Sequence, residues 1–291
     1  MTQELALIVG GGPGISASCA KLFSRNGMKA AIAARNIDKP VLLQLAEEFD
    51  VARYTCDAAD PASVAALFAA VKSDLGTPKL VVHNIDGRVR DIFGKTITEA
   101  DPDLALQTMK NGAFSAFLVA QQAATQMLVV EPDEKGLRGT ILFTNASAAN
   151  KGYARSGAFA MTCQAKAGLA QSLARELMPQ GIHIAQIPID AAIGQVQDDG
   201  SRKHARAGTD MDDNLAHPDR IAETYLHLHQ QHRSTWAFEG RKNLLEALRA
   251  QAGERLEHAA VAGNLGVADH WGFLCWSCLQ YSTGGSITDR V

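Results

Sequence analysis

The sequence has few of the features that mark secreted, membrane-spanning or nucleic-acid-binding proteins. It holds five cysteines among 291 residues, an odd number that argues against a disulfide framework. No uninterrupted apolar run approaches the roughly 18 residues of a membrane span, and Met1 to Glu4 lack the parts of a signal peptide. The net charge of -3 leaves no broad basic field. We therefore expect a cytoplasmic protein that acts on a small molecule and binds neither nucleic acid nor membrane.

Metal binding also has little support in the sequence. Cys275 and Cys278 have redox or zinc-site spacing, but no second Cys or His pair follows at a zinc-finger interval. His227, His229 and His232 lie within six residues, yet they do not share one helical face. We interpret the cysteines as reduced and structural and the histidines as part of a solvated or interface helix, and we predict no metal site.

Short apolar runs alternate with longer amphipathic segments over the first 238 residues. This alternation is typical of an α/β fold with a doubly wound parallel sheet, the Rossmann fold, with helices on both faces. The predicted strands are Leu5–Val9, Lys29–Ala34, Ala52–Cys56, Leu80–His83, Thr140–Phe143 and His183–Ile187. The predicted helices include Ile15–Arg25, Pro40–Phe49, Pro61–Leu75, Leu104–Leu128 and Phe159–Leu177, and Asp60-Pro61 and His217-Pro218 mark helix starts.

Two regions depart from this alternation. Residues 195–214 are polar and contain glycine, which predicts a surface loop placed as an active-site lid. After Phe238 the alternation stops. We therefore predict one nucleotide-binding and catalytic domain over residues 1–238 and an atypical C-terminal extension of unknown role over residues 239–291.

A glycine-rich turn follows the first predicted strand directly and leads into a helix. Gly10, Gly12 and Gly14 permit a tight turn and close approach of the backbone to phosphates. The helix that begins at Ile15 offers free N–H groups and the positive end of its dipole. We predict that these four residues bind the pyrophosphate of a dinucleotide.

Further motifs follow in a fixed order: Gly10-x-x-x-Gly14-x-Ser16, then Asn84, Ser147 and Lys166. Over roughly residues 4–238 this order resembles the short-chain dehydrogenase/reductase family. Val9 and Ser16 stand where the family usually has Thr and Gly. The resemblance implies an NAD(P)(H)-dependent oxidoreductase for a small carbonyl, alcohol or activated alkene, and a homodimer or homotetramer built on the two longest predicted helices.

The second predicted strand ends in Ala34-Arg35, without the acidic residue that accepts hydrogen bonds from the ribose of NAD. Because the Arg35 guanidinium suits a 2′-phosphate, we favour NADP(H) over NAD(H); the alternative is a surface arginine. The resemblance implies that Asp57 contacts adenine, although an aspartate capping its turn has the same pattern. It also implies that Asn84 braces the sheet beside the adenosine ribose.

In the family, a tyrosine donates a proton to the substrate oxygen, and a lysine four residues later lowers the tyrosine's pKa and binds the nicotinamide ribose. Here Lys166 is present and Thr162 stands in the tyrosine's place. An aliphatic hydroxyl is too weak an acid to replace a phenol whose pKa is about 10. Ser147 matches the serine that orients the carbonyl, with Asn145 as a rival.

Tyr153 is the only tyrosine near these residues in the sequence and is the alternative proton donor. Its displacement towards the serine is similar to that in the dienoyl-CoA and enoyl reductase branches; the alternative is a loop tyrosine that packs at a pocket edge. Asp190 is predicted to face the nicotinamide end or to cap its loop. The family's helix asparagine falls on Met109 by spacing, with Asn111 two residues late.

The changed catalytic motif leaves a second function open. A protein that binds NADP(H) as a sensor or scaffold, without turnover, is compatible with Thr162. A metal protein using the histidine cluster is the third hypothesis.

Overall fold

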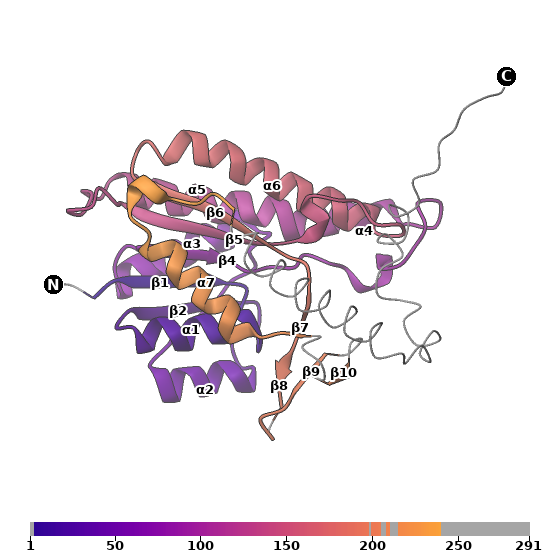
Figure 1. Cartoon of the computed structure of the whole chain (residues 1–291), viewed down its shortest axis with the longest axis horizontal. Coiled ribbons are helices and arrows are strands. Elements are labelled where there is room, and N and C mark those ends of the chain that lie inside the picture. The colour runs from indigo at the N-terminus through magenta and orange to yellow at the C-terminus, as the bar shows by residue number, and fades with distance from the viewer. Residues whose placement is uncertain (1–2, 198, 205–207, 210–214, 240–291) are drawn as a thin grey trace, which may run out of the picture. The chain divides into compact units, whose positions relative to one another are not determined.

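The centre of the molecule is a parallel sheet of six strands in the order β3-β2-β1-β4-β5-β6 (Figure 1). The computed structural model describes residues 3–197, 199–204, 208–209 and 215–239. The strand order reverses between β1 and β4, which confirms the predicted doubly wound Rossmann fold. The strands are β1 Leu5–Val9, β2 Lys29–Ala34, β3 Ala52–Thr55, β4 Leu80–His83, β5 Gly139–Ala146 and β6 Ile182–Ile189.

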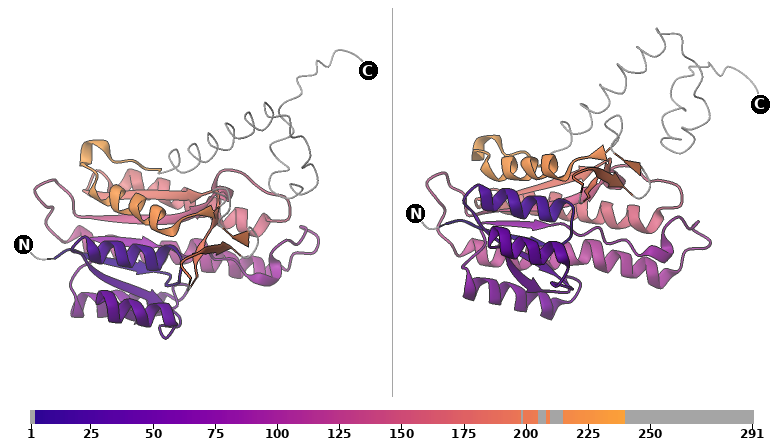
Figure 2. Two further views of the ribbon diagram at one scale, coloured as in Figure 1. Left: turned by 60° about the horizontal axis from the view of Figure 1, so that its bottom comes forward. Right: turned by 90° about the horizontal axis from the view of Figure 1, so that it is seen from below.

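Helices cover both faces of the sheet, as Figure 2 shows in two further views. One core joins the sheet to α1, α2 and α7, and the other joins it to α3, α5 and α6. Most of the strands are predominantly apolar because both of their faces are buried, whereas the edge strand β3 is only partly buried. The helices are α1 Ile15–Arg25, α2 Pro40–Phe49, α3 Pro61–Asp74, α4 Pro102–Met109, α5 Ser115–Leu128, α6 Gly157–Leu177 and α7 Pro218–Gln230.

Proline is the first residue of four of these helices, a position at which a backbone N–H would have no hydrogen-bond partner within the helix. Both predicted helix starts are confirmed, since α3 begins after Asp60 and α7 after His217. The Asp60 carboxylate also accepts hydrogen bonds from two backbone N–H groups of the first turn. Asp101 caps α4 in the same way.

The helix predicted over Leu104–Leu128 is interrupted. A five-residue π-helical turn, Lys110–Phe114, separates α4 from α5. Gly112 lies in this turn and packs so closely against α6 that a Cβ atom there would lie 2.3 Å from Cγ2 of Thr162. The helical periodicity of the sequence continues through the turn, and therefore did not reveal it.

The surface loop predicted over residues 195–214 contains short strands, and its use as an active-site lid stays a prediction. Three antiparallel strands pair in the order β10-β9-β8, and β7 pairs with β11. The polar composition fits β8, β9 and β10 because their side chains are largely exposed, whereas β11 is apolar and buried. The bounds are β7 Ala192–Ile193, β8 Gln195–Val196, β9 Arg202–His204, β10 Gly208–Thr209 and β11 Leu215–Ala216.

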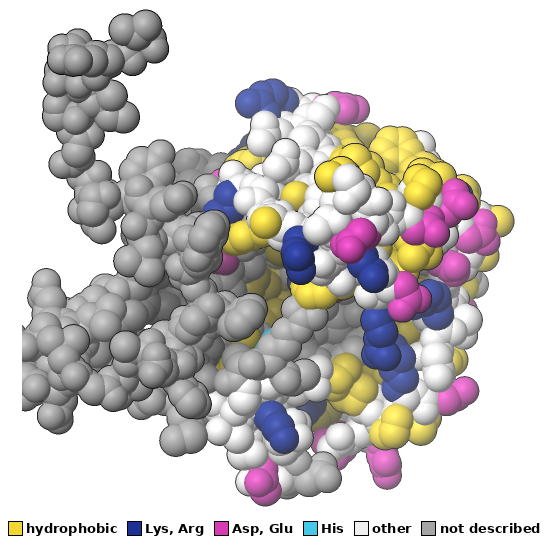
Figure 3. Space-filling view, turned by 90° about the vertical axis from the view of Figure 1, so that its right-hand side faces the viewer, with side chains coloured by type: hydrophobic (Ala, Val, Ile, Leu, Met, Phe, Trp, Pro, Cys, Tyr) yellow, Lys and Arg dark blue, Asp and Glu magenta, His cyan; other side chains and the backbone are white. Residues whose placement is uncertain are grey.

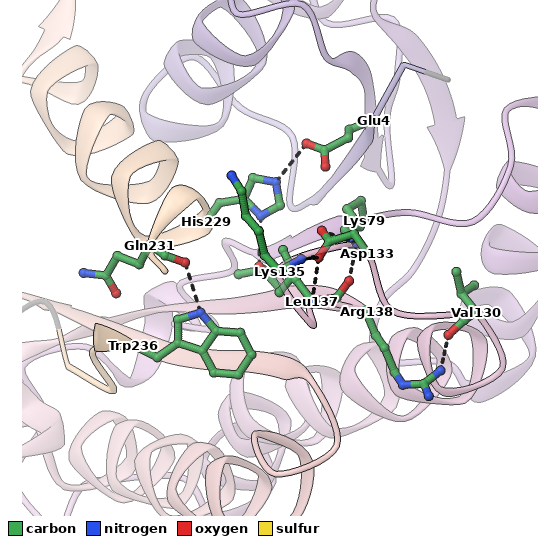
Figure 4. A network of polar contacts seen from close by, with 11 residues as sticks. Glu4, Lys79, Val130, Asp133, Lys135, Leu137, Arg138, His229, Gln231 and Trp236 are labelled. Carbon is green, nitrogen blue, oxygen red and sulfur yellow. Dashed lines mark hydrogen bonds and ion pairs between the residues drawn. The ribbon is translucent and has the colours of Figure 1, made fainter. Parts of the chain in front are cut away.

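One of the three clustered histidines, His229, belongs to a polar network at the amino ends of the strands (Figure 4). The His229 ring lies 2.9 Å from Oγ1 of Thr140 and 3.4 Å from the Glu4 carboxylate, and it is buried rather than solvated. His227 and His232 are exposed. Among the described residues no three His, Cys, Asp or Glu side chains are grouped to hold a metal. The histidine is thus a structural link between α7 and the sheet.

Several apolar side chains of the long helices are exposed. They are Leu106 at 54%, Phe114 at 42%, Phe117 at 44% and Met161 at 49% exposure. The rings of Phe114 and Phe117 are stacked, with centroids 6.3 Å apart. Contiguous exposed apolar patches mark contact surfaces, and the homodimer or homotetramer stays a prediction.

No described helix has the length and apolar character needed to cross a bilayer. Residues 240–291 lie outside the described residues. They include Cys275, Cys278 and nearly all of the predicted C-terminal extension.

Candidate functional site

A cavity of about 400 Å³ opens at the carboxyl ends of β1 to β4, beside the point where the strand order reverses. Ligands of doubly wound sheets bind at such a switch point. Figure 3 views this edge of the molecule and shows Lys and Arg side chains gathered beside a hollow. The described residues that line the cavity are Val9, Gly10, Gly11, Ala33, Ala34, Arg35, Asn36, Lys39, Cys56, Asp57, Ala58, Ala59, Asn84, Ile85, Asp86, Gly87, Arg88 and Asn111.

The glycine-rich turn forms one wall of this cavity. Gly10 has a φ of +113°, and a Cβ atom there would lie 2.2 Å from the carbonyl oxygen of Asn84. Gly12 and Gly14 are different, because a Cβ atom on either would meet no atom within 4 Å. The turn therefore needs Gly10 for its own fold, while Gly12 and Gly14 border open space at the N-terminus of α1.

Ser16 fits the position where the sequence departs from the family pattern. Its hydroxyl donates to the carbonyl oxygen of Gly10 at 2.7 Å and accepts from Nδ2 of Asn84 at 2.6 Å. The serine thus links the glycine-rich turn to the end of β4. Asn84 has the bracing contact expected of it, and Ile15, at 5% exposure, packs its side chain into the core behind the turn.

Two cations lie near the end of β2. Arg35 is exposed and lines the cavity, as does Lys39, whose Nζ donates to the carbonyl oxygen of Gly11 at 2.8 Å. Sequence reasoning missed Lys39, although a second cation four residues after Arg35 was a visible signal. Asp57 also lines the cavity, and its carboxylate accepts a hydrogen bond from the N–H of Ala59 at 3.0 Å, so it caps its own turn as well.

Lys166 is buried at 2% exposure beneath the carboxyl ends of β4 and β5. Its Nζ donates to the carbonyl oxygens of Ile85 at 3.0 Å and Thr144 at 3.2 Å. Burial disfavours the charged amine and lowers the pKa of Lys166 to about 8. A charged amine has three protons, so one donor remains for a ligand.

Thr162, one helical turn before Lys166, does not face a ligand site. It is fully buried, and its hydroxyl donates to the carbonyl oxygen of Ala158 at 2.8 Å within α6. Its methyl group fills the space beside Gly112. The threonine packs α6 against the π-helical turn.

A polar cluster lies between the loop after β5 and the end of β6. The hydroxyls of Ser147 and Tyr153 are 2.9 Å apart, and the Tyr153 hydroxyl donates to the Asp190 carboxylate at 3.3 Å. Lys151 forms an ion pair with Asp190 at 3.1 Å, and its Nζ lies 5.3 Å from the centroid of the Tyr153 ring. Two residues predicted separately, Ser147 and Tyr153, are therefore in contact, and Lys151 is a member that sequence reasoning missed.

The charges of this cluster are mutually stabilised. Burial acts to raise the pKa of Asp190, but hydrogen bonds with Ser147, Lys151 and Tyr153 outweigh it and lower that pKa. The hydrogen bond with Tyr153 and the carboxylate of Asp190 raise the pKa of Lys151. Near neutral pH the cluster therefore holds a carboxylate and an ammonium group beside two hydroxyls.

Two alternative site residues can now be placed. Asn145 is buried, and its Nδ2 donates to the carbonyl oxygen of Cys163 and to Oε1 of Gln186, so it joins β5, β6 and α6 internally. Asn111 lines the cavity from the π-helical turn, and its side chain accepts from Gln107 at 2.6 Å. Met109, the position indicated by spacing, is not among the described lining residues.

Comparison with known proteins adds to this geometry. The family model described as enoyl-(acyl carrier protein) reductase matches residues 10–236. An uncharacterized oxidoreductase of Caenorhabditis elegans is 27% identical over 247 residues, 76% of this chain and 72% of that one. The crystal structure of a short-chain dehydrogenase from Rhodopseudomonas palustris is 25% identical with a TM-score of 0.67, over 82% of this chain and 98% of that one. A metagenomic short-chain oxidoreductase in complex with NADP is 19% identical with a TM-score of 0.66, over 83% of this chain and 97% of that one. The chain belongs to the short-chain dehydrogenase/reductase family.

Proposed function

We propose that this protein is an NADP(H)-dependent oxidoreductase that moves hydride to or from a small carbonyl, alcohol or activated alkene. The observation that carries the proposal is the open space beside Gly12 and Gly14 at the N-terminus of α1, next to the cavity that Gly10 and Gly11 line at the switch point of the sheet. Backbone close to a pyrophosphate needs such space. The metagenomic relative binds NADP, which supports the same use of the site here.

The residues around the cavity fit the parts of a dinucleotide. The N–H groups at the start of α1 would hold the pyrophosphate, and Arg35 and Lys39 would supply two cations for a 2′-phosphate. Asp57 would contact the adenine, and Asn84, whose side chain donates to Ser16, would border the adenosine ribose. These charges favour NADP(H) over NAD(H).

The proton for the substrate oxygen comes from Tyr153. When bound, the cofactor supplies or accepts the hydride at the substrate carbon. Tyr153 donates its phenolic proton, and the Ser147 hydroxyl hydrogen-bonds the same oxygen and holds it in place. The nearby Lys151 ammonium stabilises the phenolate, and Asp190 keeps that ammonium in position. Lys166 would hold the nicotinamide ribose with its remaining N–H.

Turnover with a panel of small carbonyls and enones tests this function. We expect NADPH oxidation that is stoichiometric with product. NADPH binding without turnover on any member of the panel would favour a non-catalytic NADP(H)-binding sensor or scaffold, the second candidate, whose supporting observation is that the Thr162 hydroxyl is occupied within its own helix.

The affinity for NADPH should fall as pH rises through the pKa of Lys166. Burial lowers that pKa to about 8, so the charged donor is present below about pH 8 and is lost above it. Replacing a charge-assisted hydrogen bond with a neutral one weakens binding by about 1 kcal/mol, roughly fivefold. Fluorescence titrations of NADPH from about pH 6.5 to 9.5 measure this step, and Lys166→Met, which cannot titrate, should remove it. A step of the same size in the variant would assign the pH dependence to another group.

A further inference from the structure

A second cavity, of about 440 Å³, lies between the chain that follows β4 and the loop that leads into α6. Tyr153 lines it, which places the proposed proton donor in its wall. Arg88 lines both this second cavity and the cavity at the glycine-rich turn, so the two adjoin. Its volume falls within the range of small-molecule pockets.

Much of the wall of the second cavity is apolar. Ile92, Phe93 and Ile97 come from the chain after β4, and Phe159 comes from the first turn of α6. Ile97 is 85% exposed, which is high for a large apolar side chain that borders a cavity. The Arg88 guanidinium lies 4.2 Å from the Phe159 ring centroid, so its flat face adds to this surface.

The charged residues that line the second cavity are all positive. Its described lining residues include Arg88, Lys95 and Arg155 and no acidic residue. Asp86, at 3.0 Å, is the partner of Arg88, whereas Lys95 and Arg155 form no ion pair with a described residue. Glu99 does not line the cavity; hydrogen bonds from Thr96 lower the pKa of its carboxyl, and the charges of Lys95 and Arg155 lower it further.

We propose that the second cavity binds an apolar carbonyl compound that carries an anionic group, with its carbonyl at Tyr153 and its anion at Lys95 and Arg155. The carbonyl part rests on the proposed function, whereas the charge preference concerns binding alone. Apolar walls bury the body of such a ligand, and two cations that form no ion pair with a described residue supply the charge-assisted hydrogen bonds that a carboxylate or a phosphate accepts.

Titration calorimetry of the whole chain with benzoylpropionate and its uncharged methyl ester tests the proposal. We expect the carboxylate to bind about tenfold more tightly than the ester, which is the gain in affinity that one charge-assisted hydrogen bond provides. Added salt should shrink this preference. Benzyl phosphate as a competitor identifies the anion: displacement of benzoylpropionate at equal concentration assigns a phosphate site, and failure to displace it assigns a carboxylate site.

The variant Lys95→Met/Arg155→Asn should bring the ratio of the two affinities towards one, and asparagine suits position 155 because φ there is 59°. The control Lys72→Met/Lys135→Met removes the same number of charges at two exposed lysines that line neither cavity, and it should keep the ratio. Equal binding of acid and ester, or an unchanged ratio in the double variant, would overturn the proposal. A charge preference in binding without NADPH oxidation would instead reject the proposed reaction and leave the anion site standing.

Discussion

Alanine at Gly12 is expected to leave the fold intact and to remove most of the affinity for NADPH. Its methyl group would enter open space, so no described atom has to move. That space is where we place the pyrophosphate, and a methyl group there prevents close approach of the backbone. We expect a melting temperature within about 2 °C of the parent and a dissociation constant for NADPH raised at least about tenfold, measured by thermal unfolding and fluorescence titration.

Gly10→Ala is the matched contrast. Its Cβ atom would lie 2.2 Å from the backbone oxygen of Asn84, at a φ of +113°. The left-handed conformation and the overlap together cost about 3 kcal/mol or more of unfolding free energy. Loss of stability in this variant, with loss of binding alone in Gly12→Ala, separates the fold of the turn from its ligand. Unchanged NADPH affinity in a stable Gly12→Ala protein would show that the phosphates do not lie there.

Removing the hydroxyl of Tyr153 is expected to lower kcat by about 100-fold or more, as loss of a general acid does. The substitution Tyr153→Phe keeps the ring beside Lys151 and leaves the Ser147 hydroxyl in place. Because the ring is 37% exposed, the free energy of unfolding should change by less than about 1 kcal/mol. The dissociation constant of NADPH should stay the same, so the effect appears in kcat with the substrate that turns over best.

Thr162→Ser is the control for this experiment. It keeps a hydroxyl in the family's tyrosine position and removes a buried methyl group, which costs about 1 kcal/mol of stability. We expect kcat close to that of the parent, because the Thr162 hydroxyl is bonded within α6. Full activity in Tyr153→Phe would contradict the assignment of the proton donor.

The main elements of the fold were predictable because burial on both faces of the sheet makes most of its strands predominantly apolar. Predicted and observed bounds coincide for β1 Leu5–Val9, β2 Lys29–Ala34 and β4 Leu80–His83. The π-helical turn at Lys110–Phe114 was not predictable, because it keeps the apolar spacing and depends on the contact between Gly112 and Thr162. The short exposed strands β8, β9 and β10 were missed because strands with mostly polar side chains on both faces leave no periodic apolar pattern in the sequence.

Candidate site residues could be predicted where motif order and spacing along the chain identify them. They could not be predicted where they are identified by contacts between residues far apart in the sequence. Gly10 and Lys166 could be found from their spacing to other motifs. Lys151 could not, because its contact with Asp190 spans 39 residues between two loops. Ser16 stands where the family usually has Gly, and only its hydrogen bonds show how the glycine-rich turn accommodates a serine there.

Titration of the purified protein with NADPH and NADH, followed by nicotinamide fluorescence, tests the central claim most directly. The cavity at the glycine-rich turn, with Arg35 and Lys39 in its wall, predicts saturable binding of one NADPH per chain. Binding of NADH should be at least about tenfold weaker, because it lacks the phosphate that the two cations would contact. Failure of both nucleotides to bind would contradict the account.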